Sequence, residues 1–302
     1  MAEWIDLIDP TPEELRAKLP HEVYESALVR LLTPAEHGDE PRPTLQGHGN
    51  YVFGVFLVAV AVPEEDRVFY QEVDVVVTHD VLVTVSKTPP GEHFYDPRPA
   101  RDACRKDDSA GMMFYRLVDD IAERYLDLVD ELDGEIDQLE DSVETAPPPQ
   151  TRARLSELRH DLLRIRRTLA PTRDAIRRVV DNVVEVEEGQ EVFPHDVEVA
   201  FNSAYDKLLR AFDGLELSRD LIASVRDYLQ TKIANDQNEV VKKLTVIASV
   251  LLVPTFIVGV YGQNFRHHFP ELGWQWGYGW SWGLIIVTTI IQLVFFRRRK
   301  WI

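Results

Sequence analysis

The sequence predicts an α/β domain followed by a stalk of long helices and two C-terminal transmembrane helices. Three observations lead to this prediction. β-Branched and aromatic runs occur between residues 51 and 87, helical patterns begin at about Gly111, and two uncharged apolar runs occupy much of the last sixty residues. The mean hydropathy of −0.20 indicates that most of the 302-residue chain is nevertheless water-soluble.

Charge and cysteine content exclude several classes of protein. The formal net charge of −18 argues against a nucleic-acid surface, because phosphates require the opposite sign. Cys104 is the single cysteine, so no intrachain disulfide forms and the chain fits a reducing compartment. The acidic start MAEWIDLIDPTPEEL contains no secretory signal. No phosphate loop, nucleophile elbow or metal-hydrolase spacing occurs, so we expect no enzyme, no catalytic residue and no bound cofactor.

Residues 1–110 are predicted to form the α/β domain. Thr11 and Glu14 have the spacing of a capping box for a short helix that ends near Pro20. Residues 38–49, GDEPRPTLQGHG, are rich in turn residues and are expected to be loop. Three β-branched and aromatic runs are predicted as strands: 51–62, 68–78 and 80–87.

Residues 111–195 are predicted to form a charged helical hairpin. Residues 119–144 carry twelve acidic residues and one arginine, whereas residues 152–178 carry nine arginines and three acidic residues. The break TAPPPQ separates the two segments. We interpret them as antiparallel helices held partly by complementary charge. Two separately solvated faces are the alternative, since an exposed ion pair contributes only about 0–1 kcal/mol.

The C-terminal part is predicted to begin with one helix of about 66 residues, 196–261. Its stalk part, 196–243, contains no proline and no glycine cluster, and the uncharged run 244–261 would be the first transmembrane span. A second uncharged run covers 277–296. At 1.5 Å per residue the two runs are about 27 and 30 Å long, which matches a bilayer core of about 30 Å.

Positive charge predicts the orientation of the two spans. Lys242 and Lys243 precede the first span and the basic tail 297–302 follows the second, whereas the loop 262–276 contains only Arg266. By the positive-inside rule both termini are cytoplasmic and the loop is external. We therefore expect a multi-pass protein of the plasma (inner) membrane with a large cytosolic part. Five aromatic residues would form a belt at the outer interface: Trp274, Trp276, Tyr278, Trp280 and Trp282.

One face of the long helix carries a stripe with two interpretations. Steps of three and four residues define its members: Asn238, Val241, Leu244, Ala248, Leu252, Thr255 and Gly259. The stripe could be a packing seam, where small residues let helices approach closely. It could instead line a pore, with rings of Leu244 and Leu252 that gate by excluding water. Two spans are too few to enclose a pore, so oligomerisation is expected.

The strongest motif lies between the two spans. Tyr261, Gly262, Gln263 and Asn264 follow the first apolar run, and FPELGWQWGY, which contains Glu271, precedes the second. This order resembles the CorA family of divalent metal-ion transporters. The runs IRRTLAPTRDAIRRVV and DPTPEEL further upstream are also similar to that family, so the resemblance covers the whole chain and is strongest over residues 238–302.

The resemblance implies a funnel-shaped homopentameric channel in the lipid bilayer. Cytosolic α/β domains would form the funnel, the long helices would become the inner pore helices, and the second spans would pack outside. The stripe matches the family's pore-lining positions, which favours the pore over the seam. Tyr261, Gly262, Gln263 and Asn264 match the external selectivity turn, and Glu271 belongs to the outer acidic loop.

The residue types of the turn suit a hydrated divalent cation. Mg²⁺ gives up its water shell reluctantly, so Asn264 amide oxygens and Gly262 carbonyls would bind the waters of the ion. Neutral acceptors allow rapid release, and Glu271 would raise the local cation concentration. The commonest family form has Met in place of Gln263. The ion preference therefore stays open, with magnesium first, cobalt or nickel next and zinc third.

Two neighbouring features have open interpretations. His267 and His268 would either bind a soft metal ion at the entrance or be merely solvated. Pro254, inside the first span, would be either a passive kink or a bend that lets the gate widen.

The resemblance also implies a gating mechanism. Cytosolic divalent cations would bind acidic sites between subunits and hold the channel shut. The expected sensor position carries Ser203, so Asp196 and Asp206 are the regulatory candidates. Two other functions remain open. A proton-coupled Zn²⁺ transporter would depend on the pH gradient, and a membrane-anchored regulatory binding protein would carry no flux.

Overall fold

The structure of the chain is a computed structural model that describes residues 2–20, 23–35, 40–62, 67–89, 94–184, 186, 191–263 and 273–302. The chain divides into two units, Met1–Arg226 and Asp227–Ile302. The boundary falls within the segment predicted as the stalk, so helix α6 (His195–Tyr261) contributes to both units.

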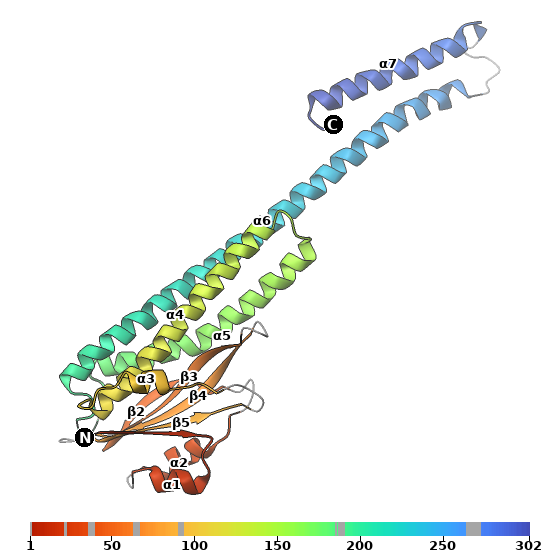
Figure 1. Ribbon diagram of the computed structural model, residues 1–302. Helices are drawn as coiled ribbons and strands as arrows, with labels where there is room; N and C mark the ends of the chain where they lie inside the picture. Colours follow the sequence, from red (N-terminus) through yellow and green to blue (C-terminus); the bar gives the residue numbers. More distant parts are fainter. Residues whose placement is uncertain are drawn as a thin grey trace. The chain divides into compact units, whose positions relative to one another are not determined.

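A five-stranded mixed sheet is the centre of the first unit (Figure 1). Its strands are β1 (Glu3–Ile8), β2 (Thr44–His48), β3 (Tyr51–Val62), β4 (Arg67–Val77) and β5 (Val81–Lys87). The strand order is β1-β5-β4-β3-β2, in which β1 runs parallel to β5 and the other neighbours are antiparallel. The three predicted strands are confirmed as β3, β4 and β5, with ends that agree to within one residue.

The prediction of loop throughout residues 38–49 is wrong. Thr44–His48 forms β2, because each of its residues pairs with β3, from Thr44 opposite Val55 to His48 opposite Tyr51. The turn residues in this segment disfavour a strand locally. Hydrogen bonding to a long apolar neighbour strand overrides that preference.

Two short helices, α1 (Pro12–Lys18) and α2 (Glu25–Leu32), cover one face of the sheet (Figure 1). Leu15, Leu19 and Leu31 from this layer share a core cluster with sheet residues such as Val83 and Val85. The predicted capping box is confirmed: the Glu14 amide donates to Thr11 Oγ1 (3.3 Å), and the Thr11 amide donates to Glu14 Oε2 (2.9 Å).

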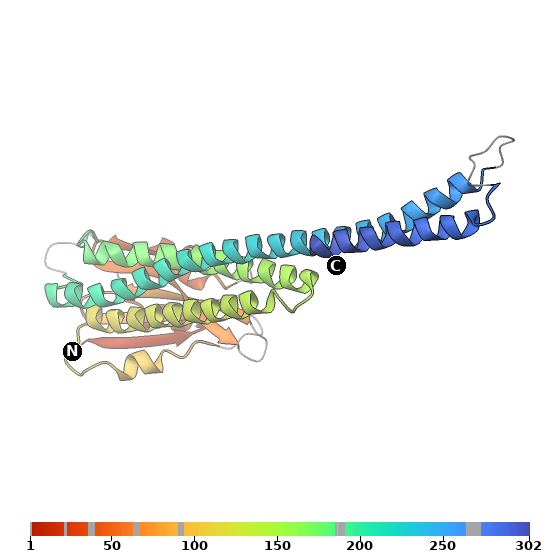
Figure 2. The ribbon, with the colours of Figure 1, turned by 90° about the horizontal axis from the view of Figure 1, so that it is seen from above.

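The predicted helical hairpin covers the other face. A short helix α3 (Arg98–Asp102) leads into α4 (Ala110–Ser142), and α5 (Pro148–Val180) returns antiparallel to α4. The first part of α6 lies beside them (Figure 2). Buried apolar residues occur along both hairpin helices: Val129, Leu132, Ile136, Leu158, Leu162 and Ile165.

Charge contributes to this helical layer, but less than apolar burial. Arg154 Nη2 of α5 lies 2.6 Å from Glu135 Oε2 of α4. Lys207 of α6 pairs with Asp119 (3.0 Å) and Glu123 (2.7 Å) of α4. Such partly exposed pairs contribute about 0–1 kcal/mol each, whereas a buried leucine contributes about 1.5–3 kcal/mol. The complementary charge that the sequence shows is therefore an addition to an apolar core.

A buried charged cluster joins β4, β5 and α2. Lys87 Nζ lies 2.6 Å from both Glu72 Oε1 and Asp74 Oδ2, and it donates to the Arg30 carbonyl (2.8 Å). Arg30 Nη2 in turn lies 2.9 Å from Glu72 Oε1. The Asp74 oxygens receive no well-oriented hydrogen bond from the described residues. Burial raises the pKa of Asp74 to about 7, against the lowering effect of the Lys87 charge.

The predicted long helix and second span are both confirmed as helices. Helix α6 runs unbroken over 67 residues, through Pro254, and α7 covers Gly277–Arg298. In the second unit, α7 returns alongside the end of α6 (Figure 2). Both α6 and α7 contain an apolar stretch long enough to cross a membrane, and little of either stretch is buried within the chain. Such exposed apolar surface requires lipid or neighbouring chains to cover it.

Candidate ion pathway

The C-terminal part of α6 has two opposite faces. One face packs toward α7 and contains buried Val246 and Ile257 with half-buried Ser249, Val250 and Val253. The predicted stripe lies on the opposite side of the helix, since successive residues rotate by about 100°. All seven stripe residues are exposed: Asn238, Val241, Leu244, Ala248, Leu252, Thr255 and Gly259. Within one chain the stripe is therefore not a seam with α7.

The chemistry of the stripe changes along the helix. Leu244 and Leu252 are 64% and 69% exposed, so the described part of a single chain leaves most of each side chain uncovered. Thr255 Oγ1 donates to the Leu251 carbonyl (2.7 Å), which leaves its oxygen lone pairs free to accept hydrogen bonds. A Cβ at Gly259 would meet nothing within 4 Å. The face can therefore line a narrow path with two apolar constrictions and polar groups between them and its outer end.

The predicted selectivity turn, residues 261–264, begins where α6 ends. The Gly262 amide donates to the Val258 carbonyl (2.8 Å), and a Cβ at Gly262 would lie only 3.0 Å from that same oxygen. Glycine thus allows the last turn of the helix to close tightly after Tyr261, which is half-buried. Gln263 is exposed. Four predicted residues lie outside the described residues: Asn264, His267, His268 and Glu271.

One polar contact between the two spans was missed by the sequence reasoning. Gln292 Nε2 of α7 donates to the Ser249 carbonyl of α6 (3.1 Å). Gln292 Oε1 is buried and has no partner among the residues described. The sequence contains a signal for this contact, because Gln292 is the single amide side chain in the apolar run 277–296. Such amides in membrane helices commonly hydrogen-bond across helices.

Aromatic and basic side chains mark both ends of the spans. The five predicted belt residues are more than half exposed: Trp274, Trp276, Tyr278, Trp280 and Trp282. At the other end of α7, Trp301 stacks on Phe296 with ring centroids 5.7 Å apart, beside the basic run that follows the span. Lys243 Nζ lies 2.8 Å from Glu239 Oε1 just before the first span.

The regulatory candidates lie on α6 in the first unit. Asp196, Ser203 and Asp206 are exposed and share one side of the helix, on which the apolar residues Val199 and Leu217 are also more than half exposed. No group of three or more metal-ligating side chains occurs in the described part of a single chain. If these acids bind a cation, other groups must complete the site.

Comparison with known proteins identifies the family. The chain matches the family described as "CorA-like Mg2+ transporter protein" over residues 2–298, which is nearly its whole length.

The chain belongs to the CorA family.

A CorA relative named "Cobalt/magnesium transport protein CorA", from Thermotoga maritima, is 32% identical over 267 residues, which cover 86% of this chain and 73% of the relative. The solved CorA magnesium transporter from Methanocaldococcus jannaschii shares the fold, with a TM-score of 0.78 at 20% identity over 99% of this chain and 91% of that one. The full-length CmaX protein has a TM-score of 0.72 at 21% identity, over 99% and 89% of the two chains. The CorA fold thus includes the sheet, the long helices and both spans.

Proposed function

We propose that several copies of this chain form a membrane channel that takes hydrated divalent cations into the cytosol, Mg²⁺ first and Co²⁺ and Ni²⁺ next. Family membership supports divalent-cation transport. The single observation that supports a channel built on α6 is the exposed stripe opposite α7. A homopentamer, with both termini in the cytosol, is the assembly that we infer from the family resemblance and the basic flanks of the spans.

In this channel the stripe lines the path. Leu244 and Leu252 would form two apolar rings that exclude water when the rings are narrow. Thr255 and Asn238 would offer oxygen acceptors to the water shell of a passing ion outside these rings. No charged side chain belongs to the stripe, so a divalent ion would not be trapped on its way.

The external turn would select the ion through its water shell. Asn264 amide oxygens and Gly262 carbonyls would accept hydrogen bonds from metal-bound waters, so the ion is never fully dehydrated. Glu271 would attract cations to the entrance without binding them directly. His267 and His268 are more simply explained as solvated loop residues than as ligands.

Gating would come from the cytosolic part. Five chains bring 5 × −18 = −90 formal charges together, a repulsion that bound divalent cations would relieve. Asp196 and Asp206, with a neighbouring subunit completing each site, would hold the closed state when cytosolic magnesium is high. Loss of magnesium would loosen the assembly and favour opening.

Flux in liposomes tests the proposal. Purified protein should carry Mg²⁺ along its gradient and in response to the membrane potential, and hexaamminecobalt(III), whose ligand shell does not exchange, should block entry. Protein-free liposomes are the control. Absence of flux would indicate a regulatory binding protein, and absence of block would contradict the recognition of hydrated ions.

A proton-coupled Zn²⁺ transporter is the second candidate, because Gln263 replaces the common Met and two histidines occur in the sequence of the predicted external loop. The same liposomes with and without a pH gradient distinguish the two functions. A coupled carrier requires the gradient for Zn²⁺ flux, whereas the proposed channel does not require it for Mg²⁺ flux.

A further inference from the structure

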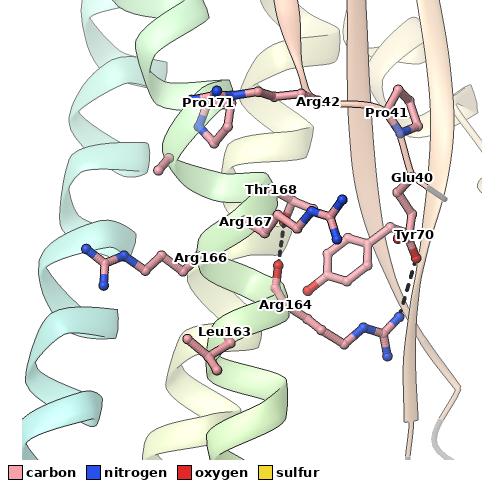
Figure 3. Close-up of a pocket in the computed structure, with 11 residues that line it drawn as sticks. Glu40, Pro41, Arg42, Tyr70, Leu163, Arg164, Arg166, Arg167, Thr168 and Pro171 are labelled. Atoms are coloured by element: carbon pink, nitrogen blue, oxygen red, sulfur yellow. Dashed lines mark hydrogen bonds and ion pairs between the residues drawn. The ribbon is translucent and has the colours of Figure 1, made fainter. Parts of the chain in front are cut away.

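A cavity of about 680 Å³ lies in the first unit, whereas the residues of the candidate ion pathway belong to the second. It is formed by the segment before β2, by β4 and by the middle of α5 (Figure 3). Its volume is in the range of small-molecule sites, which is about 300–1,000 Å³. Four arginines and one glutamate are its charged lining residues: Arg42, Arg164, Arg166, Arg167 and Glu40. The cavity is thus strongly basic in a chain whose net charge is −18.

The arginines of α5 differ in whether they have an acidic partner. Five have an acidic partner among the described residues: Arg154, Arg164, Arg166, Arg173 and Arg177. Arg166 turns away from the cavity toward α6, where its Nη2 lies 3.2 Å from Glu216 Oε1 (Figure 3). Arg167 and Arg42, in contrast, have no ion pair within the described ranges of the chain. Two guanidinium groups at this cavity are therefore available for a bound anion.

Arg164 is intermediate between the paired arginines and the two that have no ion pair in the described part of the chain. Its Nη2 is 3.6 Å from Glu40 Oε1, which is longer than a hydrogen bond, and its Cζ is 5.5 Å from the centroid of the Tyr70 ring. The contact with the ring restrains the guanidinium without using its N–H donors. A multiply charged anion can compete for Arg164, because the single carboxylate of Glu40 holds it through one long contact.

The donor set points to phosphate. Guanidinium groups match the tetrahedral oxygens of phosphate through paired N–H donors, and they stay charged at every physiological pH. Three of them, on two separate segments, suit an anion with more than one phosphate group. Beside them lies apolar surface that could contact an organic group: Pro41, Tyr70, Leu163, Ala170 and Pro171.

A neighbouring cavity of about 150 Å³ shares Glu40, Pro41 and Tyr70 with the larger one, but it does not offer the same chemistry. Its arginine, Arg30, already lies 2.9 Å from Glu72, which also lines that cavity. The larger cavity is therefore the one that suits an anion.

We propose that the cavity between α5, β4 and the segment before β2 binds a small polyphosphate anion through Arg42, Arg164 and Arg167. The anion is either a nucleoside triphosphate or an inorganic polyphosphate, since both present the same phosphate oxygens. This site belongs to the cytosolic α/β unit and does not depend on the proposed ion pathway, so anion binding and ion flux fail or succeed separately.

Calorimetric titration of the full chain in detergent, in magnesium-free buffer, tests the proposal. The probes are ATP, inorganic triphosphate and adenosine. We expect saturable binding of ATP and triphosphate and none of adenosine. Arg42→Ala and Arg167→Ala should each weaken binding about tenfold or more, because a hydrogen bond to a charged group is lost. The affinity of Arg167→Lys should lie between those of the wild type and Arg167→Ala, since lysine keeps the charge but not the paired donors.

Arg159→Ala is the matched control, because Arg159 is exposed on the same helix and does not line the cavity. It should bind as the wild type does, and all four variants should keep the wild-type melting temperature. Tighter binding of ATP than of triphosphate assigns the site to a nucleotide, and equal binding assigns it to inorganic polyphosphate. The proposal is overturned if neither phosphate binds the wild type, or if Arg159→Ala loses as much affinity as Arg167→Ala.

Discussion

Leu244 and Leu252 illustrate that the role of a leucine in a membrane helix depends on what its side chain faces. A leucine on an apolar span is ordinary where it faces lipid, and it becomes a gate only where it faces a water path. The structure leaves both side chains exposed on the side of α6 that α7 does not cover. Ala248 between them and Thr255 beyond Leu252 are small or polar, which favours the water path in the proposed channel.

Leu252→Asn should increase the flux of Mg²⁺ in the closed, magnesium-rich condition several-fold. A ring of amides at the constriction would stay wet, so the closed path would no longer exclude ions. The measurement is uptake into liposomes preloaded with magnesium. Ile247→Asn is the control, because Ile247 is also exposed but points away from the stripe. Equal flux for wild type and Leu252→Asn would contradict the gate.

Asn264→Ala should lower Mg²⁺ flux by about tenfold or more, because every subunit loses an amide that would bind the ion's waters, at about 1 kcal/mol for each hydrogen bond. Double substitution of His267 and His268 by alanine is the control in the same loop, and it should leave Mg²⁺ flux unchanged. Unchanged flux in Asn264→Ala would remove Asn264 from the selectivity turn.

At the scale of elements, α6 combines a proline with an unbroken helix. Pro254 has no amide hydrogen, so the Val250 carbonyl four residues earlier loses its usual donor. Membrane helices tolerate this where neighbours or water supply another partner. Gln292 of α7 donates to the carbonyl of the preceding residue, Ser249, which ties the two spans together beside the carbonyl that the proline leaves without its usual donor.

Pro254→Ala should raise the stability of the protein by about 1–3 kcal/mol, because the new amide can donate to the Val250 carbonyl. The passive-kink interpretation predicts unchanged ion flux. Thermal unfolding in detergent and liposome flux measure the two effects, with Leu251→Ala as a control on the same helix that alters no backbone donor. Reduced flux in Pro254→Ala would show instead that the bend takes part in opening.

In the sheet, the buried carboxyl group of Asp74 makes the stability of the fold depend on pH. Burial raises the folded-state pKa of Asp74 to about 7, above the value of about 3.9 in an unfolded chain. The folded state therefore binds more protons than the unfolded state between these values. The stability that this provides is fully present below about pH 4 and is lost as pH rises through about 7.

Asp74→Asn removes this titration while keeping the shape of the side chain. From pH 5 to pH 8 the unfolding free energy of the wild type should fall relative to that of Asp74→Asn by more than about 1 kcal/mol, since one pKa unit corresponds to 1.36 kcal/mol. Unfolding curves at several pH values measure the difference. Asp80→Asn, an exposed change in the same hairpin, should track the wild type. Parallel curves for Asp74→Asn and the wild type would contradict the raised pKa.

At the scale of the whole molecule, the role of the stripe depends on how many chains surround it. One chain leaves a large apolar surface uncovered on both spans and carries 18 excess negative charges. Lipid covers some of that surface, and neighbouring subunits would cover the rest.

Native mass spectrometry of the detergent-solubilised protein should give five copies in magnesium. After chelation of divalent cations, hydrogen exchange should increase around Asp196 and Asp206, because unscreened negative charge would loosen contacts between subunits. Exchange in the buried sheet core, for example at Val83, is the internal control. A monomer in magnesium, or unchanged exchange near both acids, would contradict the proposed assembly or its regulation.

Much of the fold could be predicted because its signals are local. Apolar run length predicts a membrane span, the capping box predicts the start of α1, and uninterrupted helical pattern predicts α6. Strand β2 could not be predicted in this way, because only its pairing with β3 makes it a strand. The stripe could be drawn from spacing alone, but spacing does not say which side of the helix α7 covers.

By itself, the sequence determined three of the strands, the long helices, the two spans, their charged flanks and the motif that indicated the CorA family, since each depends on residues close together in the chain. Only the tertiary structure decided which groups meet across long separations. It brought Lys87 between Glu72 and Asp74, set Gln292 against Ser249, and gathered Arg42 with Arg164 and Arg167 around one cavity. Such contacts depend on strand pairing and helix packing, which no short stretch of sequence contains.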